Sequence, residues 1–457
     1  MKHGRIRILA FLVALLLVSS LFPAAMADDK PEIKVWQRNS GKGGPVHDYL
    51  ADFNANQDEL TAVYEGYGEN YANMLSMALA SNDPPDIFEI QSTMPLITYA
   101  EAGHILPVDD IITEEFKAQF HPSSFAQKAL YFDGKLYAVP LRIMHYKLLY
   151  NKDLFEQAGL DPNRPPQTLE ELREYAKILT EKGNGVSYGL GFYVNYGDIW
   201  LRYIDTIAVA SGDTGVYGFD YKTGKFDFSS HKKFFHFWVD VYRDGSMFPG
   251  AVTLGVEQMR ANFAQGNVAM MIDGNWMTTQ YATNIPTEVN WEAAPLPLFE
   301  GTPRAKDYMT CDITFAIAAN GKNVEQAKAL YQNILEHQMD FRRYGEADTK
   351  TFTAANTPEA FALLPKDKVF RALDEMNNVS NHAAFPVEPH KFLKLEGDNR
   401  NTVFNNEFAL AIDGSSNIDA AIEDLNQRYN AALEKAVAEG AVTPEELAPE
   451  GFDYFTR

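Results

Sequence analysis

Aromatic residues stand beside hydrogen-bonding residues at several points of this sequence, mostly where an apolar run ends. Indole and phenol rings can stack on the flat faces of a ligand, while carboxylates, amides and guanidinium groups bind its polar groups. This pattern predicts a binding surface. The candidate residues are Trp36, Arg38, Asn39, Glu65, Tyr67, Gln91, Tyr193, Asn195, Tyr196, Trp200, Asp273 and Trp276.

Trp276 has the clearest setting of these residues. The apolar run Val268–Ile272 is typical of a strand buried on both faces. The turn residues Asp273-Gly274-Asn275 follow it. The indole would therefore stand just past the carboxyl end of a central strand, where open α/β sheets bind ligands. The alternative is that the indole packs beneath a loop.

Motifs of covalent, metal or cofactor chemistry are absent from the sequence. There is no G-x-S-x-G, H-E-x-x-H or C-x-x-C, no G-x-G-x-x-G follows a strand, and the ten histidines lack metal-binding spacing. We therefore expect no metal site and no cofactor. A carboxylate pair acting on a glycosidic bond leaves no spacing signature, because its members need only meet in space. Asp273, Asp312 and Glu65 stay open for that role, so a secreted glycoside hydrolase using an Asp/Glu pair is the alternative function.

Charge and cysteine content exclude other classes. The 457 residues carry a formal net charge of −22, with a pI near 4.9, which disfavours nucleic acid and anionic membranes as partners. The single cysteine, Cys311, cannot form an internal disulfide. The length predicts two domains rather than one core.

The first 27 residues have the pattern of a secretory signal peptide. Lys2, Arg5 and Arg7 precede the apolar run 8–18, and Ala25-Met26-Ala27 supplies a small-residue cleavage site before Asp28. The run is shorter than the roughly 20 residues that a transmembrane helix needs. No cysteine stands at the cleavage region, so we expect a periplasmic protein without a lipid anchor.

Strands and helices alternate along the remaining chain. Apolar runs predict strands over 33–36, 60–64, 87–90, 188–192 and 268–272, with helical periodicity between the first three. Asp133-Gly134 predicts a hairpin turn, and 418–437 predicts an amphipathic helix. Alternation of this kind is typical of α/β folds with mostly parallel sheets.

Two stretches resemble a known family. The first is Phe263, then Gly266-x-x-Ala269-Met270, then Gly274-x-Trp276; the second is Asp133–Pro140 followed by Tyr150–Leu154. Together they are similar to family 1 of the extracellular solute-binding proteins of ABC importers, the maltose-binding-protein-like, sugar-binding group. The resemblance covers most of 30–340 and the final helix.

The resemblance implies a two-lobed periplasmic-binding-protein fold of type II, in which each lobe has a mixed, mostly parallel sheet flanked by helices and the ligand cleft lies between the lobes. It places the chain crossings at Val139–Met144 and Glu292–Pro297. The implied division is a signal peptide (1–27), an N-lobe (28–140 and 298–350) and a C-lobe (141–297 and 351–457, with the C-terminal helix).

The same resemblance implies a binding protein rather than an enzyme. It would be a monomer that captures a sugar or oligosaccharide and delivers it to the permease subunits of an ABC transporter. The sugar is left open by the sequence. Arg38, Arg142 and His145 could face an acidic sugar, although Arg142 and His145 more readily form a charge pair at the lobe boundary.

Overall fold

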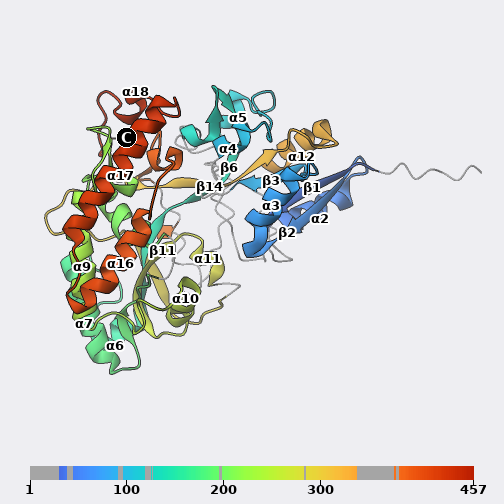
Figure 1. Ribbon diagram of the computed structural model, residues 1–457. Helices are drawn as coiled ribbons and strands as arrows, with labels where there is room; N and C mark the ends of the chain where they lie inside the picture. The colour runs from blue at the N-terminus through green and yellow to red at the C-terminus, as the bar shows by residue number, and fades with distance from the viewer. Residues whose placement is uncertain are drawn as a thin grey trace, which may run out of the picture.

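Two separate hydrophobic cores divide the chain into two lobes (Figure 1). The computed structural model describes residues 30–38, 45–90, 96–118, 125, 127–194, 198–281, 285–336, 375–376 and 380–456. One core is built mainly from residues 33–139 and 309–335, and the other from residues 146–308 and 376–454. The proposed signal peptide lies outside the described residues.

The N-lobe sheet has the order β2-β1-β3-β14-β6. Its parallel strands are β1 (Glu32–Gln37), β2 (Thr61–Gly66) and β3 (Ile87–Ile90), joined by β14 (Thr310–Ile317) and β6 (Val139–Met144), which run antiparallel to their neighbours. Helices of this lobe are α2 (Pro45–Asn56), α3 (Tyr71–Ala80), α4 (Leu96–Glu101), α5 (Glu114–Lys117) and α12 (Val324–Glu336). Because β1, β2 and β3 are parallel, their carboxyl ends meet at one edge of the sheet.

The C-lobe sheet has the order β12-β7-β11-β8. Its strands are β12 (Trp291–Ala294), β7 (Tyr146–Asn151), β11 (Val268–Gly274) and β8 (Tyr188–Leu190). All seven residues of β11 are buried, which confirms the strand predicted from the apolar run 268–272. β11 lies parallel to β8 and antiparallel to β7.

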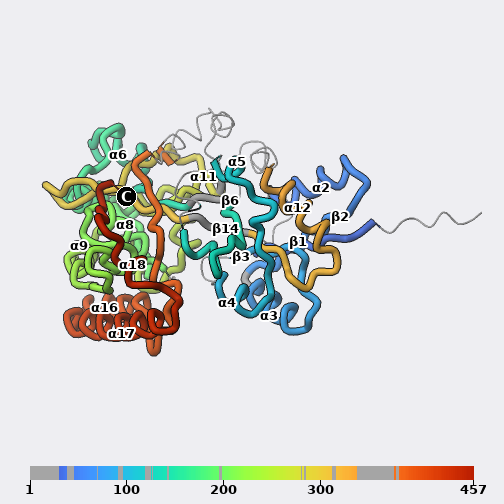
Figure 2. The backbone as a smooth tube through the Cα atoms, turned by 90° about the horizontal axis from the view of Figure 1, so that it is seen from above, coloured from blue at the N-terminus to red at the C-terminus, as the bar shows by residue number. Residues whose placement is uncertain are grey.

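Helices cover the C-lobe sheet. They are α6 (Lys152–Ala158), α7 (Leu169–Gly183), the π-helical turn η3 (Leu201–Asp205) leading into α8 (Thr206–Ala210), α9 (His231–Arg243), α10 (Val256–Ala264), α11 (Met277–Gln280), α16 (Arg400–Asp413), α17 (Ile418–Ala438) and α18 (Pro444–Leu447). Seen from above, α16 and α17 form one edge of this lobe (Figure 2). α17 confirms the helix predicted over 418–437.

Three two-stranded pairs complete the described fold. They are β4 (Tyr131–Phe132) with β5 (Lys135–Leu136), β9 (Phe219–Asp220) with β10 (Lys225–Phe226), and β13 (Asp307–Tyr308) with β15 (His382–Ala383). Asp133 and Gly134 both have positive φ in the turn between β4 and β5, as the predicted Asp-Gly hairpin requires.

The crossings between lobes differ in part from expectation. His145 separates β6 of the N-lobe sheet from β7 of the C-lobe sheet, close to the first expected crossing. The second does not lie at Glu292–Pro297, because β12 pairs with β7 along four residues inside the C-lobe sheet. Leu298, Ala305 and Tyr308 also pack in the C-lobe core, so the chain returns to the N-lobe at Met309.

Segment 382–385 lies at the waist between the lobes and contacts both of them. β15 pairs with β13, Ala384 packs in the N-lobe core, and Phe385 packs in the C-lobe core. At this waist the rings of His145 and His382 contact each other, with centroids 4.7 Å apart.

Burial of histidines in the C-lobe and at the waist predicts that acid weakens the fold. His145 and His231 have no exposed surface, and burial holds the pKa of each well below its ordinary value. The unfolded chain, with histidine pKa values near about 6.5, therefore takes up these protons first as the pH falls. Their stabilisation is complete above about pH 6.5 and declines below it, by up to about 1.4 kcal/mol per pH unit for each histidine.

Denaturant unfolding between pH 5 and pH 8 checks this expectation. His231→Gln should flatten the decline, and His236→Gln is the matched control because His236 is exposed on the same helix. Asp205 acts in the opposite sense, since burial raises its pKa to about 6 and the folded protein takes up that proton first. An unchanged pH slope in His231→Gln would contradict the prediction.

Candidate functional site

The N-lobe contributes an aromatic pair at the carboxyl edge of its parallel strands. The rings of Trp36 and Tyr67 lie 4.5 Å apart between centroids, and the Tyr67 hydroxyl donates a hydrogen bond of 2.6 Å to Glu65. Trp36 follows four residues of β1, and the backbone N–H of Arg38, just past that strand, donates to Glu89. The structure thus brings Trp36, Glu65, Tyr67 and Arg38 to one edge. Asn39 and Gln91 lie outside the described residues.

Trp276 stands just past β11, as predicted, and is partly buried. Its ring meets the Tyr146 ring edge-on, with centroids 5.6 Å apart and planes at 87°. The guanidinium groups of Arg202 and Arg260 lie 5.4 and 5.9 Å from the indole centroid, within the range of cation–π attraction. Residues from β7, β11, η3 and α10 therefore surround the ring.

Gly274 lets the Trp276 ring approach the backbone. A Cβ placed on Gly274 would lie 2.1 Å from two carbons of the indole, Cη2 and Cζ3. Any other residue at 274 must therefore displace the ring. Asn275, between them, is bonded to the first crossing: its N–H donates to the His145 carbonyl at 3.1 Å, and its Oδ1 accepts from the His145 N–H at 3.3 Å.

Asp273 is an anchor below this surface and presents no oxygen to it. The carboxylate is fully buried; Oδ1 accepts from Arg202 at 2.9 Å and Oδ2 accepts from Arg260 at 2.8 Å. Burial alone would raise the pKa of Asp273, but the two arginines hold it below its ordinary value. Asp273 was predicted to bind the ligand, but its buried carboxylate instead holds Arg202 and Arg260 in place.

Tyr193 and Trp200 are also buried completely. The Tyr193 hydroxyl accepts a hydrogen bond from Arg202, so its polar atom is bound inside the C-lobe and the expectation that Tyr193 contacts a ligand is replaced by a core role. Trp200 packs on Phe192, Phe404 and Phe408, and its Nε1 donates to Asn405 at 2.7 Å. The Trp200 ring has no exposed face on which a ligand could stack. The prediction that Trp200 binds the ligand is therefore wrong, and the residue belongs to the C-lobe core.

Some predicted ligand-binding residues lie outside the described part of the chain, and some residues around Trp276 were not predicted. Asn195 and Tyr196 lie outside the described residues, as does the side chain of Arg142. Tyr146, Arg202 and Arg260 belong to the surroundings of Trp276 but were not predicted. Arg202 did carry a signal, since an arginine within the apolar stretch 199–210 needs a buried partner.

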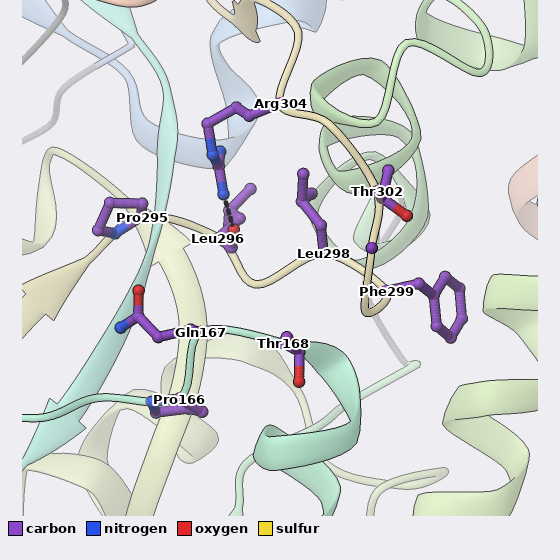
Figure 3. A pocket seen from close by; sticks show the side chains of 10 residues that line it. Pro166, Gln167, Thr168, Pro295, Leu296, Leu298, Phe299, Thr302 and Arg304 are labelled. Carbon is purple, nitrogen blue, oxygen red and sulfur yellow. Dashed lines mark hydrogen bonds between the residues drawn. The ribbon is translucent and has the colours of Figure 1, made fainter.

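A cavity of about 250 Å³ lies elsewhere on the C-lobe, between the start of α7 and segment 295–304 (Figure 3). Its lining includes Thr168, Leu298 and Arg304 but no candidate residue. The Arg304 side chain reaches across to the Leu296 carbonyl and also pairs with Asp307, while the Phe299 ring points away from the other labelled side chains. We do not assign this hollow to ligand binding.

The described part of the chain contains neither a metal-binding cluster nor a membrane-spanning helix. No group of three or more histidine, cysteine, aspartate or glutamate residues in this part of the chain is arranged to hold a metal ion. No helix among the same residues is long and apolar enough to cross a bilayer.

Comparison with known proteins identifies relatives of the main body of the chain. A family profile described as bacterial extracellular solute-binding protein matches residues 39–339. The sn-glycerol-3-phosphate-binding periplasmic proteins of Agrobacterium fabrum and Brucella abortus are 26% and 27% identical over 296 and 288 residues, or 62% and 59% of this chain. The matched regions span 65% and 62% of those relatives, less than two thirds of their length.

Solved structures show the same fold at low sequence identity. A protein from a study of xylan utilisation by Caldanaerobius polysaccharolyticus superposes with a TM-score of 0.70 at 21% identity, over 87% of this chain and 100% of the other. An ABC substrate-binding protein of Listeria monocytogenes in complex with cycloalternan gives 0.68 at 16% identity, over 91% and 100%. A Thermotoga lettingae solute-binding protein bound with α-D-tagatose gives 0.67 at 20%, over 88% and 100%. The predicted two-lobed type II fold is confirmed.

Gly274→Ala should displace the Trp276 indole without removing it. The added methyl group overlaps two ring carbons, and such overpacking typically costs about 1–3 kcal/mol of stability. Near-UV circular dichroism measures whether the Trp276 indole has moved. The spectrum of Trp276→Phe shows which bands come from that indole. Gly255→Ala is the control, because a Cβ there meets only Gln258 Oε1 at 3.8 Å. A Gly274→Ala spectrum equal to that of the wild type would refute the close packing.

Proposed function

The chain belongs to the bacterial extracellular solute-binding protein family, and from this premise we propose that it is the periplasmic substrate-binding subunit of an ABC importer. It binds a sugar or oligosaccharide between its lobes and delivers it to the permease without changing it chemically. The observation that carries this proposal is Trp276, a partly exposed indole held at the end of a central strand. Flat sugar faces of C–H groups stack on such rings.

The N-lobe supplies a matching set of groups. Trp36 and Tyr67 form an aromatic pair, and Glu65 beside them offers carboxylate oxygens to hydroxyl groups. Trp36 is buried in the N-lobe core, so Tyr67, which is partly exposed and packs on it, is the N-lobe ring that a ligand between the lobes could contact. The names of the structural neighbours, which include a cycloalternan complex and a tagatose complex, support a carbohydrate ligand.

The structure gives little support to the alternative of a glycoside hydrolase. That reaction needs two carboxyl groups flanking a bond, one of which donates a proton. Asp273 is buried between two arginines that keep it ionised. It can therefore neither reach a glycosidic bond nor donate a proton to it. Glu65 is bonded to Tyr67, and the side chain of Asp312 lies outside what the structure describes.

A ligand panel tests the proposal. Thermal shifts should identify a stabilising ligand among maltotriose, xylotriose, raffinose, tagatose, glucuronate and sn-glycerol 3-phosphate, because a ligand that binds only the folded state raises its stability. Chromatography after long incubation should recover the ligand unchanged. Small-angle scattering should show compaction through movement at the crossings near His145 and Met309. Release of a product would favour the hydrolase, and absence of binding by any sugar would refute the proposal.

Trp276 and Trp200 should respond oppositely to truncation. Trp276→Ala removes the platform, and loss of a central aromatic anchor typically costs about 2–4 kcal/mol of binding, or roughly 30-fold to 1,000-fold in affinity. Trp200→Ala opens a cavity in the C-lobe core and should cost about 3–5 kcal/mol of stability instead. Calorimetric titration and denaturant unfolding measure both effects. Near-normal affinity with a large loss of stability in Trp276→Ala would make it a core residue.

A further inference from the structure

We infer that Tyr146 is a positioning residue of the proposed ligand site: its ring holds the Trp276 indole in one orientation and links that indole to the segments where the chain crosses between the lobes. This inference rests on the proposed function and deepens it by naming the residue that connects the platform to lobe movement. Tyr146 is the first residue of β7 and directly follows His145, which separates the two lobe sheets. Only 7% of its surface is exposed, so Tyr146 supports the platform from within the protein.

Tyr146 lies directly opposite Gly274 on the neighbouring strand β11. The next pair along these two strands is joined by the hydrogen bond from the Asn275 N–H to the His145 carbonyl, at 3.1 Å. Hydrogen-bonded and non-hydrogen-bonded pairs alternate along antiparallel strands. Tyr146 and Gly274 therefore form a non-hydrogen-bonded pair, the kind in which the side chains lie closest, yet Gly274 has no side chain to place against the Tyr146 ring.

The Trp276 indole occupies the space of that missing side chain. A Cβ on Gly274 would lie 2.1 Å from two indole carbons, so the indole covers Gly274 on the face of the sheet that Tyr146 shares. There it meets the Tyr146 ring edge-on, with centroids 5.6 Å apart and planes at 87°, a favourable arrangement in which the positive edge of one ring faces the negative face of the other. Trp276 thus takes the place of residue 274 in an aromatic cross-strand pair with Tyr146.

Arg202 holds both rings of this pair. Its guanidinium lies 5.6 Å from the centroid of the Tyr146 ring and 5.4 Å from that of the Trp276 ring, within the range of cation–π attraction to each. The buried Asp273 fixes the guanidinium through a bond of 2.9 Å. The indole therefore cannot turn away from Tyr146 without losing an aromatic contact that a fixed cation supports.

Tyr146 also lies near the second crossing. Tyr308 is the last C-lobe core residue before the chain returns to the N-lobe at Met309. Burial and the nearby Glu388 raise the pKa of the Tyr308 hydroxyl well above its ordinary value, and the Tyr146 hydroxyl adds to that rise, which requires the two phenols to lie within electrostatic range of each other. Tyr146 is thus adjacent to the platform and close to both crossings, so a change in the angle between the lobes reaches Trp276 through it.

Substitutions of Tyr146 test the inference. Tyr146→Leu and Tyr146→Met both remove the ring, and the adaptable Met side chain fills more of its space, while Tyr146→Phe keeps the ring without the hydroxyl. Affinity is measured by calorimetric titration with maltotriose, xylotriose, raffinose and sn-glycerol 3-phosphate. The contribution of an aromatic pair corresponds to roughly 2-fold to 12-fold in an equilibrium constant. Tyr146→Leu and Tyr146→Met should bind the probe that the wild type binds more weakly by that factor, and Tyr146→Phe should bind it as the wild type does.

Tyr150→Leu is the matched control. Tyr150 is buried on the same strand but packs on Phe155, with ring centroids 5.1 Å apart, so its loss should lower the thermal midpoint and leave affinity unchanged. A second measurement needs no ligand. The near-UV circular dichroism bands assigned to the indole by Trp276→Phe should weaken in Tyr146→Leu and Tyr146→Met and persist in Tyr146→Phe.

The outcomes separate the inference from the proposed function. Unchanged affinity in Tyr146→Leu and Tyr146→Met would overturn the inference and leave the proposed function standing, provided that Trp276→Ala binds more weakly. An equal loss of affinity in Tyr150→Leu, or no recovery in Tyr146→Phe, would also overturn it, because the ring of Tyr146 would then have no particular part. If no probe binds the wild type, the proposed function fails, and unchanged indole bands in the ligand-free variants would overturn the inference as well.

Discussion

The buried pairing of Asp273 with Arg202 and Arg260 is the interaction on which the C-lobe site depends. A carboxylate with no exposed surface is tolerated only when its charge is matched, and removing one partner of such a group typically costs about 3–5 kcal/mol. The three residues come from β11, η3 and α10, so one charge cluster joins the central strand to a helix on either side of it. The same guanidinium groups support the Trp276 ring, which could not otherwise stand at a strand end in a fixed orientation.

A second constraint comes from the waist. The two cores are separate; the chain passes between them at His145 and at Met309, and segment 382–385 contacts both. Asn275, next to Trp276, exchanges two hydrogen bonds with the backbone of His145. The proposed ligand platform of the C-lobe is therefore bonded directly to a crossing segment. Any motion of the lobes about this waist must change what faces Trp276, which is how a binding protein of this kind can couple capture to closure.

The last part of the chain supports the C-lobe although the family profile ends at residue 339. Arg400 and Asn401, at the start of α16, hold Asp198, and His390 stacks beneath Tyr217. α17 contributes Tyr429, whose hydroxyl accepts from the Arg400 N–H at 3.1 Å. The C-terminal helices thus do more than cover the C-lobe. They hold the Asp198 carboxylate, which precedes η3, through Arg400 and Asn401.

The sequence by itself determined the elements and the place of Trp276. Apolar runs and turn residues identify β1, β3 and β11 and the helix α17, because periodicity and breakers are local properties of the chain. The same local information led to the family and its fold. It also placed Trp276 past a buried strand, since only the residues from 263 to 276 are needed for that inference.

Only the tertiary structure decided which of the polar and aromatic candidates are buried and which reach the surface. Trp200 and Asp273 have the residue types of a binding site, but their partners Phe404, Asn405 and Arg202 lie about 70 to 205 residues away in the sequence. The second crossing was misplaced for the same reason, because the pairing of β12 with β7 depends on a strand 140 residues earlier. Burial, charge pairing and strand neighbours are properties of contacts between distant segments, and a single sequence carries no direct record of them.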